Sequence, residues 1–500
     1  MKNKQIPLFK ALLLGTMMLY IDFFCGWGGA TEGIRRAEAN AKVIACVNHD
    51  EMAIQLHAVN HPDCDHLQED ITDVDTVVLK LKKIVEIWKK KYPKAFICFW
   101  LSPDCTSHTG AKGGQSRNPD SRCLADFIPT YTEAINPSYL QLENVKEFLK
   151  WGPTRLREGI SSCENYSVLA KGRKDPYIIV PDKKYDTLYY RIWRDKMMLL
   201  GYKYDYKLFN VADFGLRTSR LRYWGLFAKC GLPMKWPEKT HDKLGRNGLK
   251  KWEPARPFLD LHIKGDSIFC KPRAYNTWVR FFKGLKDNVG KLHFMTGYYG
   301  NGRHHSIENP INTLTTKDRY ALHYIQYQYG NSHTTSINEP VGTMTCNPKH
   351  EIMTLEWIMD FQYSRTSHSV DDPMYTMIAR QDKLPIYVLQ AELGYPENFI
   401  SDDDIPIVRQ IKEFMILHLI KDVTIRMLSV PEQLRLQSFG DQYFVMGATD
   451  TQAKKFIGNS VPPDMAKILV ESLFSALNAP EYSDVIYINK KSKRKYKNAA

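Results

Sequence analysis

Apolar runs with the length of a strand alternate with helix-like segments through about the first 230 residues of the chain. The helix-like segments carry apolar residues at helical spacing, most clearly over residues 74–92. The strand-like runs lie at 17–24, 43–47, 96–101, 139–145 and 222–228. Such alternation predicts an α/β domain built on a parallel, doubly wound sheet. A sheet of this kind binds its ligands at the carboxyl ends of its strands.

A different pattern begins after residue 230, where the sequence becomes rich in Pro, Gly, Lys and Trp. One template then occurs three times, as "HSIENPINTLT", "TSINEPVGTMT" and "HSVDDPMYTMI", with aligned serines at Ser306, Ser336 and Ser369. A repeat of this length is typical of a stacked supersecondary unit. The alternation that follows each proline favours turns and short strands.

These patterns predict two domains and a tail. The first domain covers residues 1–230 and is completed by 421–480. The second domain, residues 231–420, is smaller and β-rich, with the three-fold repeat at about 295–390 as its core. The basic residues at 481–500 form a tail.

Charge and cysteine usage narrow the class of protein. The chain has 69 Lys and Arg against 55 Asp and Glu, a formal charge of +14, which favours a polyanionic partner. Its ten cysteines form no CxxC pair. This argues against a disulfide scaffold or a zinc ribbon, so we expect no metal site and a reducing, cytoplasmic compartment. The apolar run near the N-terminus lacks a small-residue cleavage site, and no other run has the length of a membrane span.

A glycine-rich turn follows the first strand-like run, in the sequence "DFFCGWGGATEG". Glycines here let the backbone approach a ligand, and the amides that open the next helix can bind a carboxylate. Thr31 stands where a dinucleotide fingerprint requires its third glycine, and a turn without a ligand is the alternative. In "QEDIT", Asp70 falls where a third strand should end, a suitable place to bind an adenine amino group.

Four side chains with reactive or charged groups are expected at the same edge of the sheet. Cys105 follows one strand, Glu143 ends the next, and Arg220 and Arg222 enter a later one. A cysteine beside cations is a nucleophile, a carboxyl group can engage a heteroaromatic nitrogen, and guanidinium groups bind carbonyl or phosphate oxygens. Each residue alone is more often structural, and only their order favours catalysis.

The order of these motifs resembles that of a DNA (cytosine-5) methyltransferase of bacterial or phage type. The motifs are "DFFCGWGG", "DIT", "SPDCTSHT", "LENV", "RTSRLR", a long variable region, "LSVPEQLRLQSF" and "GNSVPP". The resemblance covers about 17–229 and 421–477 and implies a Rossmann-like methyltransferase sheet. The chain departs from the family in having Asp104 between Pro103 and Cys105, and Thr218 where glutamine is usual.

The resemblance implies that the cofactor is S-adenosyl-L-methionine. The implied turn consists of Phe24, Gly26, Gly28 and Gly29. Asp70 and Ile71 would hold the adenine, while Asn459 and Ser460 would close the pocket from the C-terminal side. The acidic residue expected for the ribose is replaced by Asn48, and Asp50 could substitute for it.

The resemblance also implies the reaction and its partners. Cys105 would attack C6 of a flipped-out cytosine, and Glu143 would engage N3. Arg220 and Arg222 would contact the cytosine and the DNA backbone. The second domain would recognise the target in double-stranded DNA. We expect a monomer without a membrane partner, and a cognate restriction endonuclease is a possible functional partner.

Three alternatives stay open at this stage. A tRNA cytosine-5 methyltransferase would have the same fold, although the large repeat-bearing insert and the basic tail favour DNA. A zinc-dependent nucleobase deaminase is suggested by "HDE" at 49–51 and by Cys105 with His108, but the P-C-x-x-C signature is missing. Cys105 and Glu143 together argue against a non-catalytic DNA-binding module.

Overall fold

The structure is a computed structural model of the 500-residue chain. The main described stretches are 17–104, 122–158, 177–289, 400–418, 420–445 and 447–479. Shorter ones are 294–297, 304–306, 320–322, 325–327, 334–335, 350–352, 355–360, 368–377 and 386–393. The chain divides into two compact units, each described by itself. The first unit is Met1–Glu253, Tyr375–Ala379 and Leu434–Ala500; the second is Pro254–Met374 and Arg380–Gln433.

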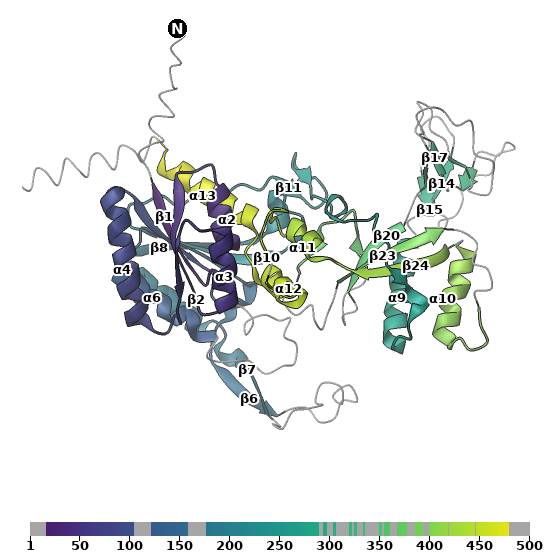
Figure 1. Ribbon diagram of the computed structural model, residues 1–500, viewed down its shortest axis with the longest axis horizontal. Helices are drawn as coiled ribbons and strands as arrows, with labels where there is room; N and C mark the ends of the chain where they lie inside the picture. Colours follow the sequence, from purple (N-terminus) through teal and green to yellow (C-terminus); the bar gives the residue numbers. More distant parts are fainter. Residues whose placement is uncertain are drawn as a thin grey trace, which may run out of the picture. The chain divides into compact units, whose positions relative to one another are not determined.

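A mixed sheet forms the centre of the first unit (Figure 1). Within the described residues it has seven strands in the order β3-β2-β1-β4-β5-β10-β8. The strands are β1 (Met18–Phe23), β2 (Ala41–Asn48), β3 (Asp65–Gln68), β4 (Phe96–Leu101), β5 (Tyr139–Asn144), β8 (Tyr202–Asn210) and β10 (Leu221–Lys229). The first five in this order are mutually parallel. Their carboxyl ends therefore meet at one edge of the sheet.

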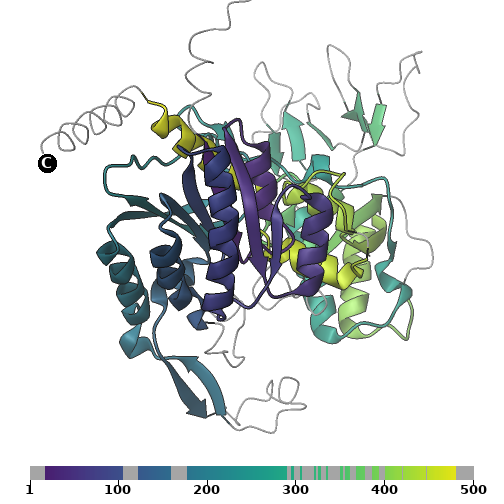
Figure 2. The same cartoon turned by 60° about the vertical axis from the view of Figure 1, so that its left-hand side comes forward.

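Helices cover both faces of this sheet, as Figure 2 also shows. They are α2 (Gly29–Arg36), α3 (Glu51–Asn60), α4 (Val74–Lys91), α6 (Ile128–Ile135), α8 (Leu188–Leu199) and α13 (Pro463–Leu477). A further helix, α12 (Asp450–Asn459), stacks Phe456 on Trp27 in the turn after β1. Side chains of α4, α6 and α8 share one core with Leu19, Ile21 and Phe23 of β1. Side chains of α2 and α13 share the other with Met18 and Tyr20. The predicted doubly wound α/β class is confirmed.

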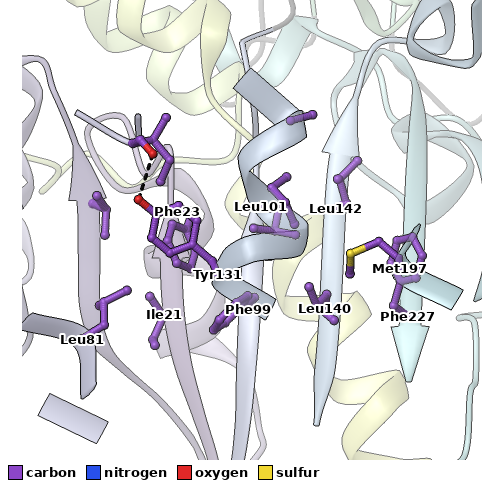
Figure 3. Close-up of a cluster of buried hydrophobic side chains, with 14 of the residues drawn as sticks. Ile21, Phe23, Leu81, Phe99, Leu101, Tyr131, Leu140, Leu142, Met197 and Phe227 are labelled. Carbon is purple, nitrogen blue, oxygen red and sulfur yellow. Dashed lines mark hydrogen bonds between the residues drawn. The ribbon is translucent and has the colours of Figure 1, made fainter. Parts of the chain in front are cut away.

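The first of these cores is made from alternate residues of neighbouring strands. Phe23, Phe99 and Leu142 project from β1, β4 and β5 into one core, in which Phe23 packs against Tyr131 of α6 (Figure 3). The rings of Phe23 and Phe99 meet edge to face, with their centroids 4.9 Å apart. A fully buried side chain of this size stabilises the fold by about 1.5–3 kcal/mol. This core holds the strand ends of the predicted site in place.

One edge of the sheet differs from the prediction. β10 is antiparallel to both of its neighbours, β5 and β8, and β8 was not among the predicted strands. Its alternation of Tyr and Lys is that of a strand with one solvated face. The short connection from β8 to β10, through a 3-10 turn at Val211–Phe214, forces the antiparallel return, because a parallel return needs a longer crossover.

The unit boundaries also differ from the predicted ones at 230 and 420. Residues 231–253 lie in the first unit. There, the backbone N–H of Thr240 donates to the carbonyl of Asp213 and the indole of Trp252 donates to the Asp213 carboxylate. Conversely, β24 (Ile420–Met427) lies in the second unit because it pairs along its length with β23 (Ile386–Leu393).

The second unit contains a five-stranded sheet in the order β13-β24-β23-β20-β21. It includes β13 (Asp266–Ser267), β20 (Leu355–Asp360) and β21 (His368–Ser369). Two helices, α9 (Tyr275–Val289) and α10 (Pro406–Leu417), supply buried residues to one core with β23 and β24. Phe281 of α9, Ile411 of α10 and Val423 of β24 are fully buried in it.

The internal repeat is visible in the strand pairing of the second unit. Three antiparallel units follow one another: β15-β14-β16, β18-β17-β19 and β21-β20-β23. Ser306 pairs with Phe294 and Ser369 with Trp357, twelve residues earlier in each case (306−294 and 369−357). Thr335, next to Ser336, pairs with Ile325, which continues the same register. Equal register in all three places shows that the sequence repeat is also a structural repeat.

The strands of the first two repeat units are short. They are β14 (Phe294–Gly297), β15 (His304–Ser306), β16 (Tyr320–Leu322), β17 (Ile325–Tyr327), β18 (Thr334–Thr335) and β19 (His350–Ile352). The remaining elements are β6 (Thr154–Glu158), β7 (Tyr177–Pro181), β9 (Thr218–Ser219), β11 (His241–Asp242), β12 (Lys250–Lys251), β22 (Met374–Tyr375) and α11 (Val430–Leu436). Among the helices described, none combines the length and the apolar character needed to cross a bilayer.

Candidate active site

The turn after β1 is open on one side and closed on the other. Phe24 and Gly26 have positive φ angles of 59° and 54°, and a Cβ on Gly26 would meet nothing within 4 Å. A Cβ on Gly28 would lie 2.6 Å from the ring of His61, and one on Gly29 would lie 2.4 Å from the carbonyl of Val461. No side chain caps the first turn of α2 at Gly28. A small anionic group therefore fits the open side of this turn.

The C-terminal segment closes on the same turn. The indole N–H of Trp27 donates to the Ser460 hydroxyl at 2.6 Å, and the Gln437 amide donates to the Ser460 carbonyl at 3.1 Å. The Tyr443 hydroxyl donates to the Trp27 carbonyl. Predicted residue Ser460 thus meets the turn, and Asn459 is exposed beside it at the end of α12. Sequence reasoning missed Trp27, Gln437 and Tyr443, and a tryptophan inside a glycine-rich turn was the one available signal.

The predicted cofactor residues on β2 and after β3 lie at the same carboxyl edge. The Asn48 side chain accepts the backbone N–H of Asp50, and the Asp50 carboxylate accepts that of Ala53 and so caps α3. Asp50 was the suggested substitute for the ribose ligand, but its carboxylate is engaged in capping α3. Asn48 ends β2 next to β1, so it remains the better placed of the two.

Asp70 and Ile71 follow β3 with different surroundings. Asp70 is exposed, and hydrogen bonds from the backbone and hydroxyl of Thr72 lower the pKa of its carboxyl group. It is therefore an anion at neutral pH. Ile71 is buried in the first core, and its carbonyl accepts the Tyr131 hydroxyl at 2.8 Å, the dashed line in Figure 3.

Glu143 and Arg222 form an ion pair at the end of β5. The guanidinium Nε of Arg222 lies 3.1 Å from the Glu143 Oε1, and both side chains are nearly buried. The pair arises because β10 runs antiparallel beside β5, with Trp224 opposite Glu143. The structure therefore brings together two of the four residues predicted for catalysis.

Asn144 connects this ion pair to the root of the cysteine loop. Its side-chain amide donates to the carbonyl of Pro103 at 3.0 Å, and its amide oxygen accepts the backbone N–H of Val145. On the other side, the backbone N–H of Ser102 donates to the carbonyl of Phe23. Cys105, two residues beyond Pro103, lies outside the described residues, as does the rest of 105–121. The loop therefore starts between the turn after β1 and the end of β5.

Arg220 occupies a different environment from Arg222. Its side chain is 1% exposed and donates to the carbonyl of Gly458 at 3.0 Å, one residue before Asn459. This burial does not favour the predicted contact with cytosine or DNA, because a phosphate cannot reach the guanidinium. Alternation along a strand does not explain the difference, because residues two apart share a face; Arg220 is the residue before β10, and its guanidinium meets Gly458 instead. Its position suits holding the C-terminal segment against β10.

A second polar cluster lies beneath the cofactor turn. It joins Cys46 of β2, His57 of α3, Cys64 just before β3 and His66 of β3, and their ligand atoms all lie within 4.8 Å of one another. These residues have no metal-ligand spacing along the chain, because they come from separate elements. The expectation that the chain has no metal site stays a prediction, and it was made without knowledge of this cluster.

Asp22 and Thr31 extend this cluster toward the turn. The Thr31 hydroxyl donates to the Asp22 carboxylate at 2.7 Å, and His57 Nε2 lies 3.1 Å from the same hydroxyl. Asp22 is fully buried in the middle of the apolar run of β1, and burial raises the pKa of its carboxyl group to about 7. A carboxylate inside such a run was a signal that sequence reasoning did not use.

Comparisons with known proteins agree with this arrangement. The family model described as C-5 cytosine-specific DNA methylase matches residues 18–161 and 182–475. The type II methyltransferase M.AquIA of Picosynechococcus sp. is 24% identical over 224 residues, 44% of this chain and 76% of the relative. The type II methyltransferase M.XorII of Xanthomonas oryzae pv. oryzae is 24% identical over 276 residues, 55% of each.

The solved structures that match this chain have a lower sequence identity to it. A methyltransferase of Entamoeba histolytica is 13% identical, with 92% of this chain and 99% of that chain covered and a TM-score of 0.42. The Dnmt2 methyltransferase of S. pombe is 13% identical, with 93% and 99% covered and a TM-score of 0.44.

The family match settles the choice among the enzyme classes considered. It extends over most of the chain and includes every motif from the glycine-rich turn to the last helix. The deaminase interpretation of "HDE" is therefore wrong, and Asp50 in that motif is a helix cap. The chain belongs to the C-5 cytosine-specific DNA methylase family and is a DNA cytosine-5 methyltransferase.

Proposed function

We propose that this enzyme transfers the methyl group of S-adenosyl-L-methionine to C5 of a cytosine in double-stranded DNA, through a covalent bond between Cys105 and C6. The observation that carries this proposal is the Glu143–Arg222 ion pair, together with the bond from Asn144 to the carbonyl of Pro103. These contacts fix a carboxyl group, a guanidinium and the start of the cysteine loop at one edge of the sheet.

The turn after β1 fits the proposed cofactor. Its open side at Gly26 and the uncapped start of α2 suit the carboxylate of the amino acid moiety. Asp70, held as an anion by Thr72, suits the adenine amino group, and Asn48 suits the ribose. When bound, S-adenosyl-L-methionine supplies an electrophilic methyl group.

The chain's own residues then activate and hold the base. The thiolate of Cys105 attacks C6 and forms a C–S bond, which makes C5 nucleophilic. Glu143 engages N3 and stabilises the negative charge that develops on the ring. C5 takes up the methyl group, a base removes the C5 proton, and elimination breaks the C–S bond. Flipping the cytosine out of the duplex is required because C6 is covered within the stack.

The two arginines have different proposed roles. Arg222 orients the Glu143 carboxyl group through Nε, while its Nη1 donates to the carbonyl of Leu221, so Nη2 is the nitrogen proposed to hold the pyrimidine carbonyl. Buried Arg220 acts as a positioning residue, because its bond to Gly458 holds the segment that carries Asn459 and Ser460. Neither role needs a metal in the reaction.

The second unit is the proposed reader of the DNA sequence. Its repeat units add nothing to the catalytic motifs, while the net charge of +14 favours a polyanionic partner. The two curated relatives are type II methyltransferases by name. We therefore also propose that this enzyme protects a site that a cognate endonuclease cleaves.

A mechanism-based trap tests the proposal. Duplex DNA with 5-fluorocytosine in the methylated site should give a denaturation-resistant adduct, since fluorine cannot leave C5 as a proton does. Cys105→Ala should give none, and Cys230→Ser, which changes an exposed cysteine of the first unit, should give the normal yield. An adduct of normal yield with Cys105→Ala would overturn the assignment of the nucleophile.

A further inference from the structure

We propose a structural Zn²⁺ site beneath the cofactor turn, with the ligands Cys46, His57, Cys64 and His66. Two thiolates and two imidazoles are a typical ligand set for zinc. The proposal concerns the fold of the enzyme and does not depend on the reaction that it catalyses.

The strand pairing places two of the ligands side by side, and the other two reach them from neighbouring segments. Cys46 of β2 is directly opposite His66 of β3 in their parallel pairing. Cys64 lies one residue before β3, and its sulfur lies 3.6 Å from His66 Nε2. His57 reaches them from α3, which follows β2. The grouping thus depends on strand register and not only on side-chain rotamers.

The distances suit tetrahedral coordination. His57 Nδ1 lies 2.9 Å from His66 Nε2, the Cys46 sulfur 3.6 Å from His57 Nδ1, and the Cys64 sulfur 3.6 Å from His66 Nε2. Ligand atoms around a tetrahedral zinc are separated by roughly 3.3–3.8 Å, given Zn–N and Zn–S bonds of about 2.0–2.1 and 2.3 Å. The four atoms lie within 4.8 Å of one another, so shifts below about 1 Å complete the site.

A hydrogen-bonded chain behind His57 supports its role as a ligand. The single hydroxyl proton of Thr31 goes to Asp22, so the Thr31 oxygen accepts the proton of His57 Nε2. This tautomer leaves the lone pair of Nδ1 directed into the cluster. Metal-binding histidines commonly donate their second N–H in this way, with a carboxylate behind it.

The charge balance also favours a divalent ion at this depth. Cys46 and His57 are fully buried, and two thiolates with Zn²⁺ and two neutral imidazoles carry no net charge. With four protein ligands the site is closed, which indicates a structural rather than a catalytic metal. The ion would join β2, α3 and β3. Of these elements, β2 ends at Asn48 and β3 ends just before Asp70.

Metal content and cobalt spectroscopy test the site on the full chain. Protein produced with added zinc and purified under reducing conditions should retain about one zinc per chain by elemental analysis. After removal of zinc, Co²⁺ should produce the visible absorption of tetrahedral cobalt with a thiolate-to-cobalt band in the near ultraviolet. The visible absorption and the thiolate-to-cobalt band should both be absent when the protein is saturated with Zn²⁺ before Co²⁺ is added.

Variants separate this site from surface binding. Cys64→Ser and His66→Gln alter the two less buried ligands and should each lose the cobalt bands and the bound zinc. Cys230→Ser is the matched control and should behave as the parent protein. Thr31→Val should keep the bands but weaken zinc binding by about 10–100-fold.

Two results would overturn the proposal. One is bound metal below a tenth of an equivalent in folded parent protein under these conditions. The other is metal binding unchanged in both ligand variants. A Cys46–Cys64 disulfide in the reduced, zinc-supplied protein, detected by peptide mass spectrometry after alkylation, would equally refute it.

Discussion

At the scale of single residues, the site depends on polar groups that lie at strand ends or inside apolar strands. Glu143 reaches Arg222 because β5 and β10 are neighbours. Asp22 is buried within β1 and bonded to Thr31. The first is proposed to act on the cytosine, whereas the second affects the stability of the fold, so the two residues call for different measurements.

Replacing Glu143 with Gln should abolish most turnover while leaving cofactor affinity intact. The amide keeps the shape of the side chain but loses both the negative charge that pairs with Arg222 and the acid function toward N3. Loss of a positioned acid–base group typically costs ~10²–10⁴-fold in rate. Methyl transfer to DNA and calorimetric titration of S-adenosylmethionine measure the two effects. Near-normal turnover at neutral pH would contradict the role given to Glu143.

Asp22→Asn should stabilise the protein at pH 8 and have little effect near pH 4. Burial raises the pKa of Asp22 to about 7, so the folded state keeps a proton that the unfolded chain releases near its ordinary pKa. Stability therefore falls as pH rises from about 4 to 7, by up to roughly 4 kcal/mol from this group.

Chemical denaturation of parent and variant at several pH values measures this difference. Asp70→Asn is the control, since hydrogen bonds from Thr72 lower the pKa of Asp70. Its carboxylate stabilises the folded state above its unfolded pKa and loses this effect on acidification. The Asp22 interpretation fails if Asp22→Asn has the same pH dependence of unfolding as the parent protein.

At the scale of elements, α2 and α13 hold the N- and C-terminal parts of the first unit together. Gly33 of α2 allows the contact, because a Cβ there would lie 2.2 Å from the carbonyl of Pro463 and 2.6 Å from the Cβ of Ala466. The same helix starts at the cofactor turn, where Gly29 faces the carbonyl of Val461. Small residues on one helix therefore set the distance between distant segments of the chain.

Gly33→Ala should destabilise the enzyme even though alanine favours helices. The gain in helix propensity is about 1 kcal/mol, whereas forcing a methyl group against a backbone carbonyl typically costs ~1–3 kcal/mol and here also separates two helices. Thermal and urea unfolding should both show the loss. Gly26→Ala is the control, because its Cβ meets nothing within 4 Å and only its φ of 54° opposes alanine. A Gly33→Ala protein as stable as the parent would refute this packing argument.

At the scale of the whole molecule, chemistry and proposed DNA reading belong to different compact units. In the described residues, the buried core of the second unit draws on α9, α10, β23 and β24, and the strands of the first two repeat units form two sheets of their own. This separation permits a deletion that spares both cores.

Replacing residues 290–353 with a short Gly-Ser linker should leave folding and S-adenosylmethionine binding unchanged. It should relax or shift the methylated sequence, because each lost base contact removes ~1–3 kcal/mol of discrimination. Bisulfite sequencing of host DNA identifies the methylated sequence. If the methylated motif stayed the same, the first two repeat units would not be readers, and the proposal would be confined to β20–β24.

Much of the fold could be predicted because its signals are local. Strand-length apolar runs alternate with amphipathic segments, so the doubly wound class and the start of α2 at the glycine-rich turn followed directly. The register of the three repeats is equally local, since each pairs strands only twelve residues apart. The place of Glu143 at a strand end also came from the sequence.

Only the tertiary structure decided what depends on contacts between distant segments. It turned β10 antiparallel, and it buried Arg220 against Gly458 while pairing Arg222 with Glu143. It also assembled the Cys46, His57, Cys64 and His66 cluster. No spacing in the sequence predicts these contacts. Strand order and helix docking determine which side chains become neighbours, and both are set by burial of the two cores.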